Sequence, residues 1–188
     1  MSPRTTAAES VIQCEATVAA LSGKLIVRLP DAASSALPSR NQVATTGTID
    51  GQPFDVVVEP DGRRGHWINL SDVRPQPDGL AAGQDITLTI APASEWPEPD
   101  VPDDLRAALE GAPDVLELWA SITPMSRWEW VRWVRATRNP ATRAKRVEVS
   151  ISKLRAGKRR PCCFDLSACT DPDLARSGKL IDADTEGG

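Results

Sequence analysis

The first half of the chain alternates apolar and polar positions, which is the pattern of strands buried on one face. Six short runs carry this alternation, with turn residues between them: 12–18, 25–29, 43–49, 54–58, 66–70 and 86–90. Asp50-Gly51 lies between the third and fourth runs, and both residues tolerate the positive φ angles of a tight hairpin. Short strands with frequent turns predict a small antiparallel β-barrel over residues 8–94.

The second half has an apolar period of about 3.6 residues, which predicts helices over residues 103–160. Ser126 and Glu129 have the spacing of a capping box, so we expect a helix to begin there. Asn139-Pro140 supplies an N-cap and a first-turn proline for the next helix, and Gly157 supplies its end.

Two further segments complete the expected organisation. Residues 95–102 hold three prolines and three acidic residues, which predicts a stiff, extended linker. The polar residues 161–188, which include three of the four cysteines, are expected to form a flexible tail. The sequence therefore predicts an α+β protein in which a barrel, a linker, a helical module and a tail follow one another.

Charge is divided unevenly between segments. Residues 95–126 carry one basic and eight acidic groups (net −7), whereas residues 127–160 carry twelve basic and two acidic groups (net +10). Solvated helix faces normally mix both signs. The basic excess therefore indicates either an anionic partner or neutralisation by the acidic segment of the same module.

Two segments carry family-specific patterns. Residues 47–54 read G-x-I-x-G-x-P-F, and a Gly-His-Trp strand follows at 65–67. Residues 128–158 contain a Trp-Val-Arg run, then T-R-x-K-R, then L-x-x-G-K. In this order the patterns resemble the two domains of the YdeI/OmpD-associated family, although residues 73–79 place two prolines where that family has a short helix. The resemblance implies a double-split-like barrel and a role in tolerance of bacteriocins or antimicrobial peptides at the cell envelope.

Enzyme chemistry finds little support in the sequence. The protein has no G-x-G-x-x-G, Walker, G-x-S-x-G or H-E-x-x-H motif. Its one histidine, His66, has no nucleophile beside it in the sequence, so we expect a structural or exposed imidazole. We therefore interpret the protein as non-enzymatic and without a cofactor.

The four cysteines do not have zinc-site spacing. Cys162 and Cys163 are adjacent and Cys169 follows after a gap of five residues, whereas zinc sites favour C-x₂₋₄-C pairs. We expect no metal site and predict that these three thiols react with alkylating reagents while Cys14, in a strand, does not. The tail thiols act in redox chemistry, favoured by the neighbouring arginines, or stay reduced without a role.

Helical spacing separates the tryptophans near residue 130. Trp130 lies on one face with Trp133, and Trp128 lies on the opposite face with Arg132 and Arg135. We predict that Trp128 is the exposed tryptophan of the module, with the two guanidinium groups beside it. The alternatives are a Trp128 packed against another surface and arginines that are simply solvated.

The leading interpretation is a binding protein located in the cytoplasm, since no apolar stretch reaches about 20 residues and no signal-like segment begins the sequence. Its partner would be an anionic macromolecule or a protein. One alternative is a nucleic-acid-binding or regulatory protein that uses the arginine-rich helices, although the pI of 5.1 counts against it. Another is a small-molecule pocket at the barrel mouth, lined by Arg40, His66 or Trp67. The predicted binding residues are Trp128, Arg132, Arg135, Arg143, Arg146 and Arg40.

Overall fold

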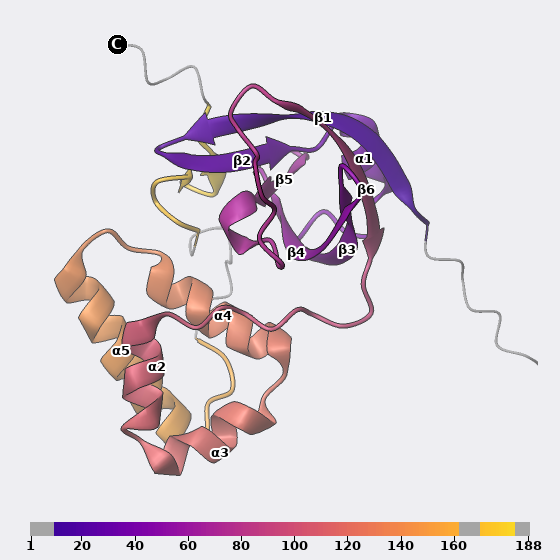
Figure 1. Cartoon of the computed structure of the whole chain (residues 1–188). Helices are drawn as coiled ribbons and strands as arrows, with labels where there is room; N and C mark the ends of the chain where they lie inside the picture. The colour runs from indigo at the N-terminus through magenta and orange to yellow at the C-terminus, as the bar shows by residue number, and fades with distance from the viewer. Residues whose placement is uncertain (1–9, 162–169, 183–188) are drawn as a thin grey trace, which may run out of the picture. The chain divides into compact units, whose positions relative to one another are not determined.

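The computed structural model describes residues 10–161 and 170–182, which divide into two compact units (Figure 1). The first unit comprises residues 10–19, 24–60 and 64–94. The second comprises the described residues from 95 onward together with two turns, 20–23 and 61–63.

The first unit is built on a closed antiparallel barrel, as predicted. Its six strands pair in the order β1-β2-β5-β4-β3-β6. The strands are β1 (Ile12–Leu21), β2 (Lys24–Arg28), β3 (Val43–Ile49), β4 (Gln52–Pro60), β5 (His66–Asn69) and β6 (Asp85–Pro92). The inward-facing apolar residues of these strands form one core, which includes Val18, Val27, Val58, Ile68, Leu88 and Ile90.

Two short glycine-dependent features shape the barrel. Asp50 and Gly51 have φ angles of 49° and 83° and form the tight turn between β3 and β4 that the sequence predicts. Gly47 faces β6 so closely that a Cβ atom there would collide with the carbonyl oxygen of Thr89. A side chain at position 47 would therefore force β3 and β6 apart.

Two helical turns complete the first unit: α1 (Asp31–Ala36) and a 3₁₀ turn, η1 (Leu70–Asp72). The sequence analysis did not predict α1, because its alanines and serines have no apolar period. Ala33 nevertheless is buried in the barrel core, and Ser34 is buried as well.

The second unit contains four helices: α2 (Asp103–Glu110), α3 (Pro113–Ser121), α4 (Pro124–Arg135) and α5 (Pro140–Arg155). The Thr123 hydroxyl caps α4 by accepting a hydrogen bond from the Ser126 backbone, so α4 begins earlier than the expected Ser126. Thr123-Pro124 supplies both the cap oxygen and the fixed φ of the first turn. Asn139 caps α5 as predicted.

The helices surround an apolar core centred on Trp130, which is fully buried. Leu105, Val115, Val134 and Leu154 contribute to this core from α2, α3, α4 and α5. Gly157 ends α5 with a φ of 80°, and its backbone donates to the carbonyl of Leu154 at 2.8 Å.

Part of the expected flexible tail has a defined structure. β7 (Ala175–Arg176) and β8 (Lys179–Leu180) form a hairpin, and Leu174 and Leu180 are buried. The Ser22 hydroxyl donates to the Asp173 carbonyl at 2.8 Å, and the Leu180 backbone donates to the Asp61 carbonyl at 3.0 Å. The turns 20–23 and 61–63 thus anchor this hairpin through contacts that the sequence pattern does not reveal.

No helix in the described part of the protein is both long and apolar enough to cross a membrane.

Candidate anion-binding surface of the helical unit

Trp128 lies in α4 and is half-buried. The Trp96 ring, from residues 95–102, meets it edge to face with centroids 5.1 Å apart. The Arg132 guanidinium lies over the Trp128 ring at 4.9 Å, as the helical spacing predicts. Trp119 and Trp133 are half-buried too, so the prediction that Trp128 is the one exposed tryptophan is wrong. Burial beside Trp96 removes a large apolar ring from water.

Arg132 is buried as well, with only 8% of its surface exposed. Its Nη2 donates to the hydroxyl of Thr170. A guanidinium enclosed in this way supports the local packing of α4 and residue 170. It does not present its charge to a partner in solution.

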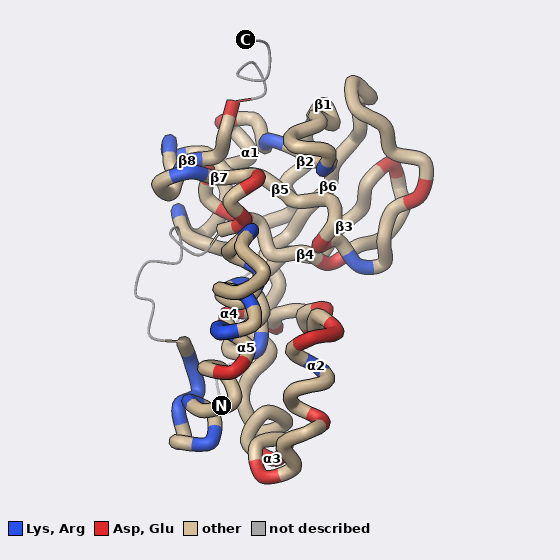
Figure 2. Tube along the Cα trace, turned by 90° about the vertical axis from the view of Figure 1, so that its left-hand side faces the viewer, with Lys and Arg blue, Asp and Glu red and all other residues tan. Residues whose placement is uncertain are grey.

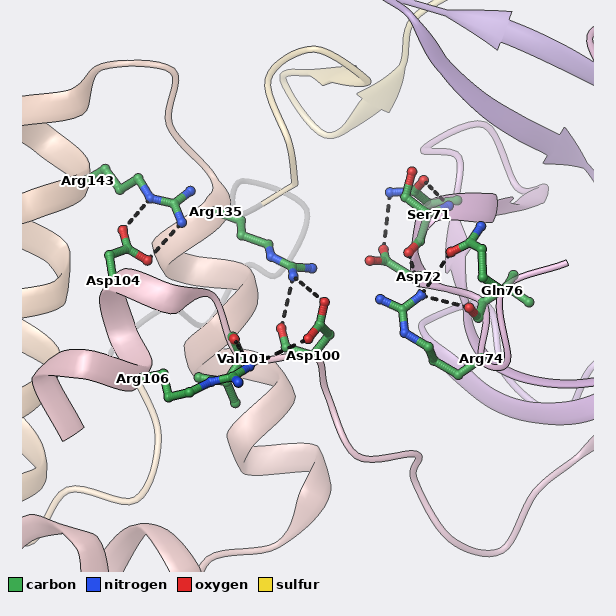
Figure 3. Close-up of polar contacts among 12 residues, drawn as sticks. Ser71, Asp72, Arg74, Gln76, Asp100, Val101, Asp104, Arg106, Arg135 and Arg143 are labelled. Carbon is green, nitrogen blue, oxygen red and sulfur yellow. Dashed lines mark hydrogen bonds and ion pairs between the residues drawn. The ribbon is translucent and has the colours of Figure 1, made fainter. Parts of the chain in front are cut away.

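Arg135 and Arg143 pair with acidic residues at the start of the second unit (Figure 3). Arg135 Nη2 donates to the Asp100 carbonyl at 2.9 Å and lies 3.7 Å from its carboxylate. Arg143 forms a two-point contact with Asp104, at 2.6 and 3.0 Å. Arg106 also approaches Asp100, at 3.9 Å. These arginines therefore hold helices α2, α4 and α5 to the linker and to one another.

Each of two further arginines donates hydrogen bonds to the C-terminal carbonyl groups of the preceding helix. Arg127 Nη1 donates to the carbonyls of Trp119 (3.0 Å), Ala120 (3.3 Å) and Ile122 (2.5 Å) at the end of α3. Arg146 Nη1 donates to the carbonyls of Trp133 (2.7 Å) and Ala136 (3.0 Å) at the end of α4. Both guanidinium groups thus cap a helix C-terminus, because they neutralise acceptors that the helix leaves unpaired.

Hydrogen bonds from arginine side chains lower the pKa of two of the acidic partners. The two-point contact from Arg143 lowers the pKa of Asp104, and the contact from Arg155 (2.5 and 3.2 Å) lowers the pKa of Asp114. Arg127 also contacts Glu98 through two nitrogen atoms, at 2.9 and 2.5 Å. At least four of the twelve basic residues in 127–160 thus form ion pairs with the acidic segment 95–126, which supports one of the two alternatives that the sequence left open.

Three cations at the end of α5 differ from these arginines. Lys153, Lys158 and Arg159 form what we call the α5 basic end, and no carboxylate of the described residues lies within ion-pair distance of them. Lys158 and Arg159 are exposed and Lys153 is half-exposed. Figure 2 shows Lys and Arg along α4 and α5 and just beyond α5, whereas Asp and Glu mark α2 and α3.

The α5 basic end adjoins a half-buried aromatic ring. Lys153 Nζ lies 5.7 Å from the centre of the Trp133 ring, and the Arg146 guanidinium lies 5.4 Å from it. Trp133 in turn meets Trp130 edge to face, and Trp130 Nε1 donates to the Arg159 carbonyl at 3.0 Å. These contacts fix the backbone from which the three cations project.

Glu129 is the acidic residue closest in sequence to this ring, and it is committed to another pair. It is 2% exposed and accepts hydrogen bonds from two nitrogen atoms of Arg160, one at 2.6 Å. The Glu129 carboxylate raises the pKa of Arg160. A buried carboxylate needs such a partner, because an unpaired buried charge is costly.

The first unit contains a buried polar cluster around His66, one of the residues named for the alternative of a barrel pocket. His66 is 1% exposed, with Nδ1 2.6 Å from the Ser34 hydroxyl and Nε2 3.1 Å from the Asn41 carbonyl. Because a carbonyl only accepts, Nε2 carries the proton and Nδ1 accepts from Ser34. Ser34 lies 32 positions earlier in the sequence, so no sequence spacing could reveal this contact.

The other residues of the expected pocket also bond within the first unit. Trp67 is buried and its Nε1 donates to the Pro60 carbonyl at 3.2 Å. Arg40 Nη1 donates to the Arg64 carbonyl at 2.7 Å. His66 and Trp67 therefore do not line an open barrel mouth, because their polar atoms bond to neighbouring backbone and side-chain groups in the core.

Cys14 is half-buried in β1, and burial, with a smaller effect of Glu15, raises the pKa of its thiol. Cys162, Cys163 and Cys169 lie outside the described residues. Within residues 10–161 and 170–182, no group of three or more His, Cys, Asp or Glu side chains could hold a metal ion.

Comparison with protein families gives two matches, one for each unit. Residues 14–90 match a domain of unknown function, DUF1905, and residues 98–157 match the family described as bacteriocin-protection, YdeI or OmpD-associated. Neither the curated proteins nor the solved structures gave a match. The two matches occur in the order that the sequence patterns predict, and they confirm the resemblance to the YdeI/OmpD-associated family, whose own match spans residues 98–157.

Proposed function

We propose that the protein is a non-enzymatic binding protein that contributes to tolerance of bacteriocins or other antimicrobial peptides, and that it acts in the cytoplasm. The family description supplies the biological setting, since it names bacteriocin protection. We further propose that the partner is an anionic macromolecule.

The observation that carries this proposal is the α5 basic end. Lys153, Lys158 and Arg159 remain without a carboxylate partner among the described residues, while the neighbouring Arg143 and Arg155 are paired. Placing three cations together raises the free energy of the folded protein through repulsion. An anionic partner would remove that repulsion on binding.

Nucleic acid is a second candidate partner for the same surface. Lys and Arg bind phosphate groups without regard to sequence, and such binding weakens steeply as salt rises. Trp133 favours this candidate in one respect, because its half-buried indole ring lies beside these cations and aromatic rings can stack on bases.

Survival of bacteriocin-treated cells tests the proposed function. A sensitive bacterial strain would express the wild-type protein, a variant with Lys153→Gln, Lys158→Gln and Arg159→Gln, or a control variant with Lys145→Gln, Arg176→Gln and Lys179→Gln. The control removes three exposed cations elsewhere in the second unit. We expect the wild-type protein and the control to increase survival at equal protein levels, and the first variant to lose this effect. Equal survival with and without the wild-type protein would contradict the proposal.

A further inference from the structure

The α5 basic end is held together by the backbone that ends the helix. The Lys158 backbone donates to the Lys153 carbonyl at 3.0 Å, so the backbones of these two residues are adjacent although they are five positions apart. The carbonyl of the next residue, Arg159, accepts the hydrogen bond from buried Trp130. The three cations therefore start from a fixed backbone, which reduces the entropy lost when an anion binds.

Acidic residues that pair with other cations lie on α5 or contact it. Glu148 of α5 contacts Lys145 at 2.9 Å, and Asp114 of α3 contacts Arg155. Asp114 is half-exposed and Glu148 more so, with side-chain exposures of 53% and 69%. A long polyanion that extends beyond the three cations would be repelled by these carboxylates. The net negative charge of the protein, with its pI of 5.1, would repel it as well. The charge pattern therefore favours a short anionic segment.

The neighbouring ring is already occupied by cations of the same unit. Both Arg146 and Lys153 lie over Trp133, and Arg146 is fixed there by its two hydrogen bonds to carbonyl groups of residues 133 and 136. A nucleobase that stacked on Trp133 would have to displace these cations. Carboxylates would instead accept hydrogen bonds from the cations where they already lie.

From this geometry we propose that the α5 basic end binds a short acidic segment of a partner protein, in which several Asp or Glu side chains lie close together. The proposal rests on the proposed function, because it names the partner class of the same surface. Charge complementarity between three cations and a few carboxylates is its physical basis.

Lys153 also has a structural interpretation, since a cation in the last turn of a helix interacts favourably with the helix dipole. Lys158 and Arg159 directly follow Gly157, which ends α5, so the same structural interpretation extends to them. A structural role predicts a change in thermal stability with unchanged binding. A binding role predicts the opposite, so both quantities are measured below.

Fluorescence anisotropy with defined probes tests the proposal on the full-length protein. The probes are a labelled hexaglutamate peptide, a hexaglutamine peptide and a hexathymidylate oligonucleotide. The proteins are the wild type and the two triple variants used for the survival assay, which change the net charge equally. We expect hexaglutamate to bind more tightly than hexathymidylate, and hexaglutamine not to bind.

The two variants separate a local surface from a general charge effect. We expect Lys153→Gln, Lys158→Gln and Arg159→Gln together to weaken hexaglutamate binding at least about tenfold, which corresponds to about 1.4 kcal/mol. The control should change it less than about threefold, and both variants should melt near the wild-type temperature. Equal weakening by both variants, tighter binding of the oligonucleotide, or a large loss of stability without a loss of binding would each overturn the proposal.

The two proposals can fail separately. If the oligonucleotide binds more tightly while the first variant still loses protection in cells, the acidic-segment proposal is wrong and the proposed function stands. If the peptide binds as expected but neither the wild-type protein nor the variants affect survival, the binding site stands and the proposed function is wrong.

Discussion

Replacing Arg127 with alanine is expected to destabilise the helical unit strongly. The Arg127 side chain is 13% exposed and satisfies three carbonyl groups at the end of α3, in addition to its contact with Glu98. Hydrogen bonds from a charged donor contribute about 1.5–3 kcal/mol each, but here one nitrogen serves all three acceptors, so we count the set as about 2–3 kcal/mol. Glu98 is 63% exposed, and its pair with Arg127 adds at most about 1 kcal/mol.

The total for Arg127→Ala is therefore about 3 kcal/mol. For a unit of fewer than about 100 residues, each kcal/mol lowers the melting temperature by about 4–8 °C, so a decrease of about 12–24 °C is expected. Differential scanning calorimetry and urea unfolding of the full-length protein measure it. Arg127→Lys should lose about half as much, because an ammonium group cannot reach Glu98 and the carbonyls together.

Arg106 provides the matched control for this substitution. It contacts the Val101 carbonyl at 2.8 Å, but its side chain is 53% exposed, so Arg106→Ala should cost less than about 1 kcal/mol. If Arg127→Ala destabilised the unit no more than Arg106→Ala, water would be replacing the guanidinium at the α3 carbonyls, and the reasoning from burial would be refuted.

Four other predictions concern the ion pairs, the thiols and the units. Arg160→Ala should destabilise the second unit by about 2 kcal/mol, because it leaves the buried Glu129 carboxylate without its partner. The same substitution in a Glu129→Gln background should cost less stability. Equal costs in urea unfolding would contradict the pairing. Because the pKa of Asp104 is lowered in the folded state, its stabilising effect is complete above its ordinary pKa of about 3.9 and is lost as pH falls below that value. The melting temperature of Asp104→Asn should therefore fall less steeply than that of the wild type between about pH 4 and pH 2.5, and parallel curves would contradict this. Brief alkylation, followed by mass mapping, should modify Cys162, Cys163 and Cys169 before Cys14. The Cys14 thiol is half-buried and has a raised pKa, so less of it is present as the reactive thiolate. Faster modification of Cys14 would refute that order. A fragment of residues 1–94 should unfold cooperatively by itself, and an insoluble product would show that the barrel depends on the second unit.

Local sequence signals predicted the elements that depend on neighbouring residues. Asp50-Gly51 determines its own turn, and Asn139-Pro140 determines where α5 begins, because in each case the required backbone angles and hydrogen bonds involve residues close in sequence. Helix α1 gave no such signal, and the β7–β8 hairpin gave only its turn, Ser177-Gly178, whose φ angles are 50° and 75°. The first has six residues without an apolar period, and each strand of the second has two.

The candidate site was harder to predict, because its charges are decided by distant partners. The charge map indicated that segment 95–126 could neutralise segment 127–160, but it could not tell which arginines would be used. Arg143 contacts Asp104, which is 39 residues away in sequence, and Trp128 contacts Trp96, which is 32 residues away. Helical spacing correctly predicted Arg132 over Trp128, a contact within one helix. It could not predict that Trp96 and Thr170, both distant in sequence, would contact Trp128 and Arg132.

The two arginine caps have a consequence for how the helical unit folds. The last carbonyl groups of α3 are completed by Arg127 of α4, and those of α4 by Arg146 of α5. Each helix therefore lacks part of its hydrogen bonding until the next one has formed and docked, and helices of this length are marginal by themselves in water. Partly folded forms with one or two helices gain little, so α3, α4 and α5 should form and melt together in a single transition.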